Sequence, residues 1–458
     1  MRPILDLAIA RRVLTLGAPV IFAMLSQASI NLVDTIFVGR LPRDVATAGQ
    51  SALGISLPLF WMFGGACSAL GVGTQAMVAR RYGEGNREGA GAVLANSVLL
   101  AVLASAVVTI AGWLALPALF RLMHDDPSVR ELGTTYARLR FVGIVSMVGT
   151  FSFKAFYDGT ERTWVHLVVA IVMNLANILL AWLLVFGKLG FPRLEVAGAG
   201  IAAVIASFLG LLGMMAFTFR RGDRRDFRPY RASNISGRQL WAIAKLSLPS
   251  GAATLVVMTG FLMVLWVVGR IDELTPRAGS VHTAGSKIIM DIMSLCFIGC
   301  MGLGTATATL VSKSLGESKP ELAERYGWEA MKVGAVVFGL LGVLEAVFPD
   351  AALGVFTADA AVIDAARSSM RLIGGLEFMV AIGLIATQCL FGAGNTRFVM
   401  FAELTLHFGA LIPLSYVFGV LMDWGVLGVW IAAAVYIVGL TCTMVVKFAA
   451  GGWKTIKI

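Results

Sequence analysis

The chain is patterned as long apolar runs separated by short polar segments. A helix needs about 20 apolar residues to cross a hydrocarbon core. We count about twelve runs of that length, which begin near Val13, Val45, Ala90, Leu132, Val165, Val196, Trp241, Val281, Val333, Leu372, Phe398 and Val426. The runs are continuous and do not alternate with a period of two. They therefore predict membrane-spanning helices and exclude a transmembrane β-barrel.

Composition supports the same class. Hydrophobic residues make up 58% of the 458 positions and charged residues only 14%, whereas about a quarter of a soluble domain is charged. So much apolar surface requires a lipid bilayer as its main partner. We therefore expect an all-α integral membrane protein.

The net charge of +10 follows the predicted topology. If the N-terminus is cytoplasmic, the loops on that side carry most of the basic residues, among them Arg80, Arg81, Arg87, Arg162, Lys313, Lys319, Arg397 and Lys447. This bias predicts that both termini are cytoplasmic, in a bacterial inner membrane. No basic domain interleaved with aromatic residues is present, which argues against nucleic-acid binding.

The two halves of the chain repeat each other. The motif Val38-Gly39-Arg40-Leu41 recurs as Val268-Gly269-Arg270-Ile271, and Pro19 and Pro249 stand at the same separation. Further pairs follow in order: Gly71-Val72-Gly73-Thr74 with Gly302-Leu303-Gly304-Thr305, and Gly159 and Thr163 with Gly392 and Thr396. The order and spacing persist over nearly the whole chain, so chance is a poor explanation.

Such a repeat predicts two lobes of six helices each. An even number of spans separates the copies, so both lobes have the same orientation and are related by a pseudo-two-fold axis along the membrane normal. The boundaries we expect are an N-terminal lobe over 1–219, an Arg-rich cytoplasmic linker over 220–240 and a C-terminal lobe over 241–458. Because the repeat is internal, a monomer suffices for function.

Several motifs resemble the MATE (multidrug and toxic compound extrusion) family. The matching segments are Pro19 to Gly39, Gly71 to Asn86, Asn174 to Gly200 and Gly392 to Arg397. The resemblance implies a secondary active antiporter that exports organic cations or amphiphilic drugs in exchange for H⁺ or Na⁺ by alternating access. It implies no cofactor beyond that coupling ion and no enzymatic activity.

Asp34 is the first candidate for the coupling site. A carboxylate inside an apolar span is costly, and an intramembrane ionisable residue is a functional hypothesis by default. Gln27, Asn31 and Asp34 have helical spacing and form a polar stripe. The repeat position of Asp34 is Val264, so the fold does not require an acid there. The alternative is an aspartate that only bonds a neighbouring helix.

The resemblance extends to neighbouring residues of the first half. It implies that Asp34 and Gln27 belong to the coupling site, and that Pro19 provides a conformational kink, since proline leaves a helix carbonyl without its donor. Asn174 and Asn177 share a helix face and could complete the pocket. Family members often have an aspartate where this chain has Ala181, so the resemblance leaves the coupling ion open.

The second half offers polar pairs four residues apart. Lys287 and Asp291 could pair across one helical turn, which favours a structural role. Glu403 and His407 could relay protons near neutral pH, unless Glu403 lies at the cytoplasmic interface. We expect Glu377 to be a cavity residue close to the end of a span.

Other functional classes find little support. The five cysteines and four histidines show no spacing typical of a disulfide framework or a metal site. There is no Walker loop and no catalytic cluster, which argues against an ATP-driven pump and an enzyme. The main alternative is a flippase for lipid-linked precursors. Its cavity would be richer in Arg and Lys, whereas most Arg residues here lie in loops.

Overall fold

The computed structural model describes residues 6–275 and 280–458, and the regular elements in these ranges are helices. The first repeat and the linker contain α1 (Leu7–Gly39), α2 (Arg43–Ser68), α3 (Leu70–Gly83), α4 (Arg87–Met123), α5 (Pro127–Gly159), α6 (Trp164–Phe186), α7 (Glu195–Thr218), α8 (Arg221–Phe227) and the 3₁₀ turn η1 (Ala232–Asn234). The second repeat contains α9 (Gly237–Leu274), α10 (Val281–Gly316), α11 (Pro320–Val347), α12 (Pro349–Gly354), α13 (Ala360–Gly374), α14 (Glu377–Gly392), α15 (Thr396–Leu406), η3 (His407–Leu411), α16 (Ile412–Tyr416), η4 (Val417–Leu421), α17 (Gly425–Ala449) and η5 (Gly452–Thr455).

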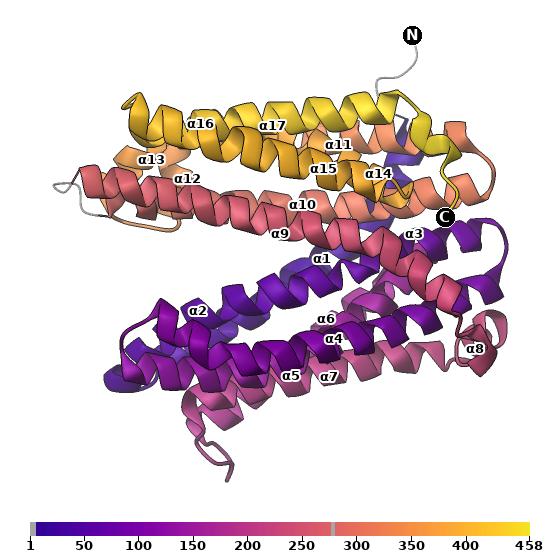
Figure 1. Cartoon of the computed structure of the whole chain (residues 1–458), viewed down its shortest axis with the longest axis horizontal. Helices are drawn as coiled ribbons and strands as arrows, with labels where there is room; N and C mark the ends of the chain where they lie inside the picture. The colour runs from indigo at the N-terminus through magenta and orange to yellow at the C-terminus, as the bar shows by residue number, and fades with distance from the viewer. Residues whose placement is uncertain (1–5, 276–279) are drawn as a thin grey trace. The chain divides into compact units, whose positions relative to one another are not determined.

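The number of membrane spans confirms the prediction. Within the described ranges, 11 helical segments are long and apolar enough to cross a membrane, and a bent pair of helices makes up to 12. Several helices begin before the apolar runs that predict them, α1 at Leu7 and α11 at Pro320. The reason is that helices continue past the hydrocarbon core into polar turns. Figure 1 shows the long helices, coloured from the N-terminus to the C-terminus.

The bent span consists of α13 and α14, which meet at an angle of 54°. The break follows a close contact with α11: a Cβ at Gly342 would lie 2.2 Å from the carbonyl oxygen of Gly374. A glycine at each position allows the two backbones to approach. The apolar run that begins near Leu372 therefore predicts only the second part of this span, because α13 carries charged residues on its outer side.

The helices form two compact units whose borders differ from the predicted lobes. One unit is Phe22–Gly251, and the other joins the described residues before Phe22 to the described part of Ala252–Ile458. The borders fall inside α1 and α9, shortly after Pro19 and Pro249. Each repeat's first helix therefore begins in one unit and ends in the other, and the predicted linker over 220–240 belongs to the unit Phe22–Gly251.

The repeated glycine motifs explain how the first segments of α1 and α9 pack within these units. In one unit, a Cβ at Gly302 of α10 would lie 2.4 Å from Cγ1 of Ile21 on α1. In the other, a Cβ at Gly73 of α3 would lie 2.9 Å from the carbonyl oxygen of Ile243 on α9. Small residues let transmembrane helices approach closely. Each glycine motif thus receives the first segment of the other repeat's first helix.

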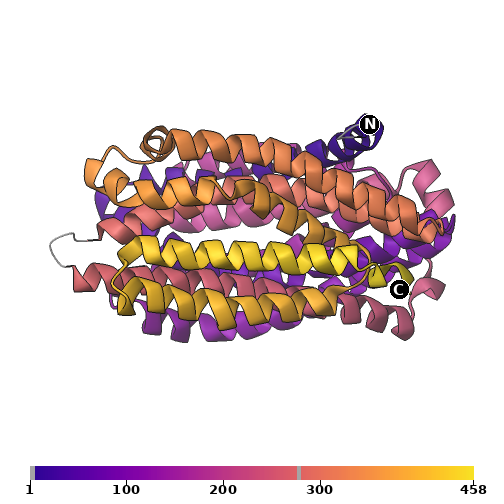
Figure 2. The ribbon, with the colours of Figure 1, turned by 90° about the horizontal axis from the view of Figure 1, so that it is seen from above.

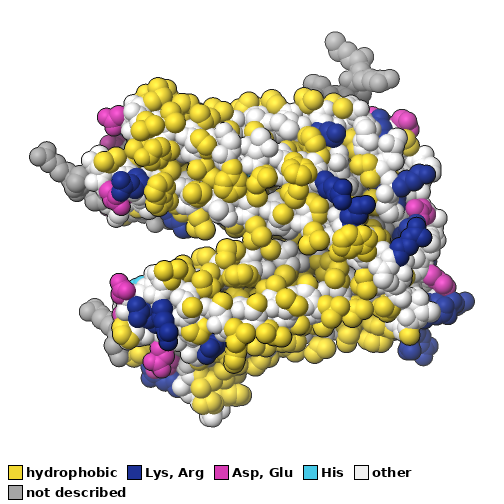
Figure 3. All heavy atoms as spheres, in the orientation of Figure 1, with side chains coloured by type: hydrophobic (Ala, Val, Ile, Leu, Met, Phe, Trp, Pro, Cys, Tyr) yellow, Lys and Arg dark blue, Asp and Glu magenta, His cyan; other side chains and the backbone are white. Residues whose placement is uncertain are grey.

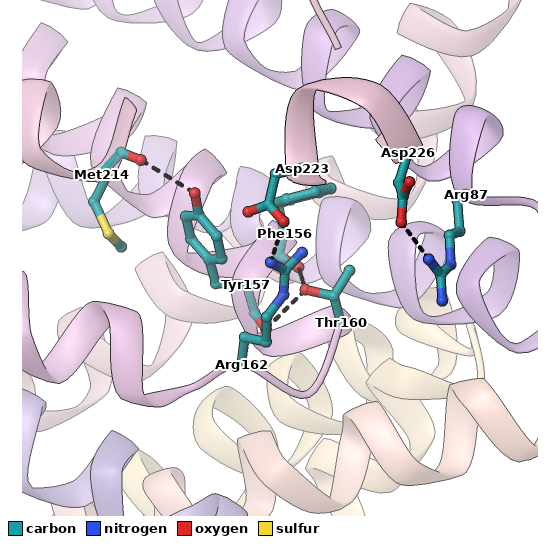
Figure 4. A network of polar contacts seen from close by, with 8 residues as sticks. All are labelled: Arg87, Phe156, Tyr157, Thr160, Arg162, Met214, Asp223 and Asp226. Carbon is teal, nitrogen blue, oxygen red and sulfur yellow. Dashed lines mark hydrogen bonds and ion pairs between the residues drawn. The ribbon is translucent and has the colours of Figure 1, made fainter. Parts of the chain in front are cut away.

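The Arg-rich linker is folded onto its unit. Asp223 and Asp226 of α8 form ion pairs with Arg162, at 2.6 Å, and with Arg87. Figure 4 shows these two pairs on either side of α8. Phe227 is buried, with its ring edge-to-face on that of Phe156 at a centroid distance of 5.1 Å. The linker is therefore an ordered part of the unit and not a free tether.

In the second repeat, α15, η3, α16 and η4 form one continuous span beside α17 (Figure 2). This span contains two π-helical segments, His407–Leu411 and Val417–Leu421. π-bulges leave backbone groups without their usual helical partners and occur often at functional sites. Figure 3 shows hydrophobic side chains along the sides of the helices and most charged side chains near helix ends, as expected for membrane spans.

Candidate functional site

The carboxylate of Asp34 is completely buried near the end of α1. The hydroxyl of Tyr136 on α5 donates a hydrogen bond to Oδ2 at 2.9 Å. Oδ1 has no hydrogen-bond partner among the described residues. Burying an ionised carboxylate is costly unless it is paired and hydrogen-bonded. The second oxygen is therefore the free position of this site.

The position of Tyr136 follows from its own helix and from α7. Asp126 caps the start of α5 by accepting a hydrogen bond from the backbone N–H of Ser128 at 2.8 Å, and Pro127 occupies the first turn. Tyr136, two and a half turns on, is fully buried. A Cβ at Gly200 of α7 would lie 3.2 Å from its ring, so a small residue there makes room for the phenol.

Arg140 brings a positive charge into the same pocket. It lies one turn after Tyr136, is 5% exposed, and donates to Oδ1 of Asn31 at 3.1 Å. Its guanidinium also lies over the ring of Phe60, 4.4 Å from the centroid. Since Asn31 and Asp34 are on one face of α1, the guanidinium is held beside the carboxylate. A cation in this place offsets part of the cost of burying Asp34.

The two asparagines of α6 occupy different positions. Asn177 is completely buried beside Asp34, and neither its amide nitrogen nor its oxygen has a hydrogen-bond partner among the described residues. Asn174 donates to the hydroxyl of Ser26 on α1 and to the carbonyl oxygen of Ala170, the latter at 3.0 Å. Asn177 therefore completes the Asp34 pocket, whereas Asn174 joins α6 to α1 outside it.

The remaining first-half candidates are farther from the carboxylate. Gln27 is half-buried two turns before Asp34, and no hydrogen bond links the two within the described part of α1. Pro19 lies in the segment of α1 that belongs to the other compact unit. Their roles in coupling stay predictions.

The pocket provides hard oxygen ligands and one fixed cation. Oδ1 of Asp34 and the amide of Asn177 lie beside each other, and neither has another hydrogen-bond partner among the described residues. A carboxylate and an amide can take up a proton or a small hard cation such as Na⁺. Among the described residues, no group of three or more His, Cys, Asp or Glu could hold a metal ion.

In the second repeat, Lys287 and Asp291 pair as expected, with Nζ 2.5 Å from Oδ1. Their side chains are 58% and 44% exposed, which fits a pair on the outside of α10. Glu377 is completely buried at the first residue of α14, where α13 and α14 meet at the bend, and its role as a cavity residue stays a prediction. Gly342 packs against its side chain, and Glu345 of α11 lies nearby.

Glu403 and His407 are brought together with a third residue. Nδ1 of His407 lies 3.3 Å from the carboxylate of Glu403, and the hydroxyl of Tyr436 on α17 donates to that carboxylate at 2.9 Å. Glu403 is 5% exposed and His407 is completely buried. Glu403 is therefore held inside the protein by side-chain contacts, and its role in proton relay stays a prediction.

Tyr136, Arg140, Glu345 and Tyr436 contribute to these sites but were not expected from the sequence. Arg140 and Glu345 could have been found, because each is an ionisable residue within a predicted span. The two tyrosines gave no such signal. Aromatic residues are common in membrane helices, and only the packing shows which carboxylate each one meets.

The family model described as MatE matches residues 19–183 and 249–417, which is one copy in each repeat. The chain belongs to the MATE family. It is therefore a multi-pass membrane transporter and not an enzyme.

Relatives match over nearly the whole length. The "Probable multidrug resistance protein NorM" of Thermotoga maritima is 25% identical over 452 residues, covering 97% of this chain and 93% of that protein. The "Multidrug resistance protein PmpM" of Pseudomonas aeruginosa is 26% identical over 463 residues, covering 98% and 92%.

Solved MATE structures share the fold. An outward-facing multidrug resistance MATE family transporter superposes with a TM-score of 0.85 at 22% identity, covering 97% of this chain and 95% of that one. The eukaryotic MATE transporter AtDTX14 superposes with a TM-score of 0.86 at 16% identity, covering 98% and 97%.

Proposed function

We propose that the chain is a secondary active multidrug exporter that moves organic cations or amphiphilic drugs outward in exchange for H⁺ or Na⁺. Asp34 is the coupling carboxylate. The transporter works by alternating access as a monomer in a bacterial inner membrane, with both termini cytoplasmic. The names of the NorM and PmpM relatives support the substrate class, and the basic bias of one set of loops supports the orientation.

The observation that carries this proposal is the free oxygen of a fully buried carboxylate. Oδ1 of Asp34 has no hydrogen-bond partner among the described residues, although Oδ2 accepts from Tyr136. An ionised group in this position gains from binding a cation, since a bound H⁺ or Na⁺ satisfies the open oxygen and cancels the buried charge. The site can therefore exist in two forms, one with an ionised Asp34 carboxylate and one with H⁺ or Na⁺ bound to it.

Loading changes the forces between α1 and the helices around it. In the empty form, the negative charge of Asp34 attracts Arg140 and accepts from Tyr136, both on α5. Binding of the coupling ion cancels that charge and weakens both attractions. The ion therefore favours a different arrangement of α1 relative to α5, which is the differential interaction that a conformational switch requires.

The flippase alternative would require free positive charge for a pyrophosphate group. The two buried cations of α5 are already matched: Arg140 lies beside Asp34 and bonds Asn31, and Lys154 pairs with Asp158 at 2.5 Å. This matching leaves little free positive charge on α5 for an anionic substrate and supports the export of cations.

The test is dye export in proteoliposomes. An ethidium-type dye is followed while either a pH gradient or a sodium gradient is imposed, with wild type, Asp34→Asn and Asp291→Asn side by side. Asp291 is the control because its carboxylate is exposed and paired. We expect one gradient to drive export in wild type and in the control but not in Asp34→Asn. Absence of dye movement under both gradients in wild type would contradict multidrug export.

A further inference from the structure

Three side chains of the second repeat form a buried cluster of a different kind. Glu403 and His407 lie one turn apart where α15 passes into the π-helical segment η3, and Tyr436 reaches them from α17. The rings of His407 and Tyr436 meet edge-to-face at a centroid distance of 4.5 Å. The phenol of Tyr436 donates to Oε2 of Glu403, the same oxygen that lies 3.3 Å from Nδ1 of His407.

The hydrogen bonds determine which ring nitrogen of His407 carries hydrogen. Nδ1 lies 3.0 Å from the backbone carbonyl oxygen of Glu403. A carbonyl oxygen can only accept, so Nδ1 is the donor and bears the proton. In the neutral imidazole the other nitrogen, Nε2, is then a bare acceptor. It is fully buried and has no hydrogen-bond partner among the described residues.

The backbone around the imidazole is shaped to hold it. A Cβ at Gly260 of α9 would lie 2.3 Å from Cδ2 of the ring and 3.2 Å from Nε2, so only glycine leaves room for His407 in this orientation. The π-helical segment begins at His407 itself. Such bulges are frequent at functional sites because they aim a side chain that a regular helix would place elsewhere.

Few other charges act on this cluster. The imidazole of His407 faces Glu403 on its own span and the phenol of Tyr436 on α17. The one charged residue of α17, Lys447, lies over the ring of Phe398 near the start of α15. The middle of α9, from Leu246 to Gly269, contains no ionisable residue, and α14 carries its one charged residue, Glu377, at its first position. Glu403 is therefore the counter-charge of His407.

We propose that Glu403, His407 and Tyr436 form a second proton-binding site of this transporter, which loads its proton at Nε2 of His407. A proton from water binds the bare lone pair, no covalent bond of the protein breaks, and the resulting imidazolium is neutralised by the carboxylate of Glu403. Imidazole is the side chain that most readily exchanges a proton near neutral pH. Tyr436 positions the carboxylate, because its hydroxyl keeps Oε2 on the side of the ring.

This site is separate from Asp34 in sequence and surroundings. His407 stands at the same repeat separation from Asn174 as Thr396 does from Thr163, so the second repeat has an imidazole where the first has a neutral amide. Each meets the first helix of its own repeat: Asn174 bonds Ser26 of α1, and His407 packs on Gly260 of α9. The inference that this proton contributes to export rests on the function proposed above, whereas proton binding itself does not.

Proton binding is tested by ¹⁵N NMR of histidine-labelled protein in lipid nanodiscs. The chain has 4 histidines, and a His407→Gln spectrum identifies the signal of His407. The pH is varied from alkaline to acidic. We expect the neutral tautomer protonated at Nδ1 at the alkaline end of this range and a doubly protonated ring at the acidic end. Glu403→Gln removes the counter-charge and should reduce the doubly protonated fraction at each acidic pH.

A signal that keeps one tautomer throughout this range, or a neutral ring protonated at Nε2, would overturn the proposal. So would a titration that Glu403→Gln leaves unchanged. His282→Gln is the control for labelling and folding, since its imidazole lies at the start of α10 away from Glu403. If His407→Gln does not fold, the Glu403→Gln and Tyr436→Phe spectra still decide the question, with Tyr416→Phe of the same span as the control.

The contribution to export is measured as the number of protons exchanged per dye molecule in proteoliposomes. We expect His407→Gln and Glu403→Gln to exchange fewer protons per dye than wild type, His282→Gln and Tyr416→Phe. An unchanged ratio in both variants would remove the cluster from coupling. A wild type that exports no dye would instead contradict the proposed function, while the NMR result would stand.

Discussion

The hydroxyl of Tyr136 on α5 donates a hydrogen bond of 2.9 Å to the carboxylate of Asp34 on α1. Oδ1 of the same carboxylate has no hydrogen-bond partner among the described residues, and the amide of Asn177 lies beside it. The helix that carries the proposed coupling acid is thereby joined to a helix that also carries Arg140. The strength of that connection depends on whether the acid is loaded.

Removing the phenol should therefore weaken coupling. Tyr136→Phe leaves the ring packed against Gly200 but deletes the donor. A hydrogen bond to a charged group contributes about 1.5–3 kcal/mol. We expect a slower gradient-driven dye export and a lower midpoint of thermal unfolding than in wild type. Tyr230→Phe, at a phenol that bonds Thr218 outside the site, is the control. Equal export by Tyr136→Phe and wild type would show that the bond has no role in coupling.

Arg140 and Asp34 should depend on one another for stability. Arg140→Gln leaves a buried carboxylate without its neighbouring cation, which costs about 3–5 kcal/mol when a buried pair is broken. Asp34→Asn removes the charge that needs compensation. We therefore expect the double variant to unfold at a higher temperature than Arg140→Gln alone, measured by thermal unfolding in detergent. Strictly additive effects of the two substitutions on the unfolding temperature would contradict this mutual dependence of Arg140 and Asp34.

The glycine motif of α10 should tolerate no side chain. In Gly302→Ala the new Cβ would lie 2.4 Å from Cγ1 of Ile21 and 3.0 Å from its backbone nitrogen, so α1 or α10 must move. Overpacking of this kind costs about 1–3 kcal/mol. Gly269→Ala is the matched control, because nothing lies within 4 Å of its Cβ. A thermal midpoint in Gly302→Ala equal to that of Gly269→Ala would contradict the close packing of α1 on α10.

The folded linker should resist proteases as long as Phe227 anchors it. Phe227 is buried against Phe156, and truncation of a buried phenylalanine costs about 3–5 kcal/mol. Phe227→Ala should therefore expose the arginines of α8 to trypsin and speed cleavage between Arg220 and Arg238. Phe219→Ala, at a ring that is 48% exposed, provides the control. Cleavage at the wild-type rate in Phe227→Ala would show that the linker is held by its ion pairs alone.

Much of this architecture could be predicted from the sequence. Apolar runs of the right length gave the spans, and the recurrence of Gly71–Thr74 as Gly302–Thr305 gave the two repeats. The exchange of the first segments of α1 and α9 could not be predicted, because a repeat shows which segments are equivalent but not which ones pack together. The same limit applies to the linker, where the arginines indicated a polar segment while the buried Phe227 fixes its fold.

The candidate site residues could also be predicted in part from the sequence. Asp34 stood out because an acid in an apolar run is expensive, and the pairing of Glu403 with His407 followed from helical spacing. The bend beside Glu377 could not be predicted, because it depends on the contact of Gly374 with Gly342 on another helix. Contacts between distant segments, such as Tyr136 with Asp34, leave no periodic trace in the chain.

The most direct test of the central claim separates coupling from substrate passage. Asp34→Asn and wild type are reconstituted into proteoliposomes, and dye movement is measured once against an imposed ion gradient and once as counterflow with dye on both sides and no gradient. The account predicts that Asp34→Asn loses gradient-driven accumulation but keeps counterflow, because the carboxylate binds the ion and does not form the path of the dye. Accumulation at the wild-type level in Asp34→Asn would contradict the assignment of Asp34 as the coupling carboxylate.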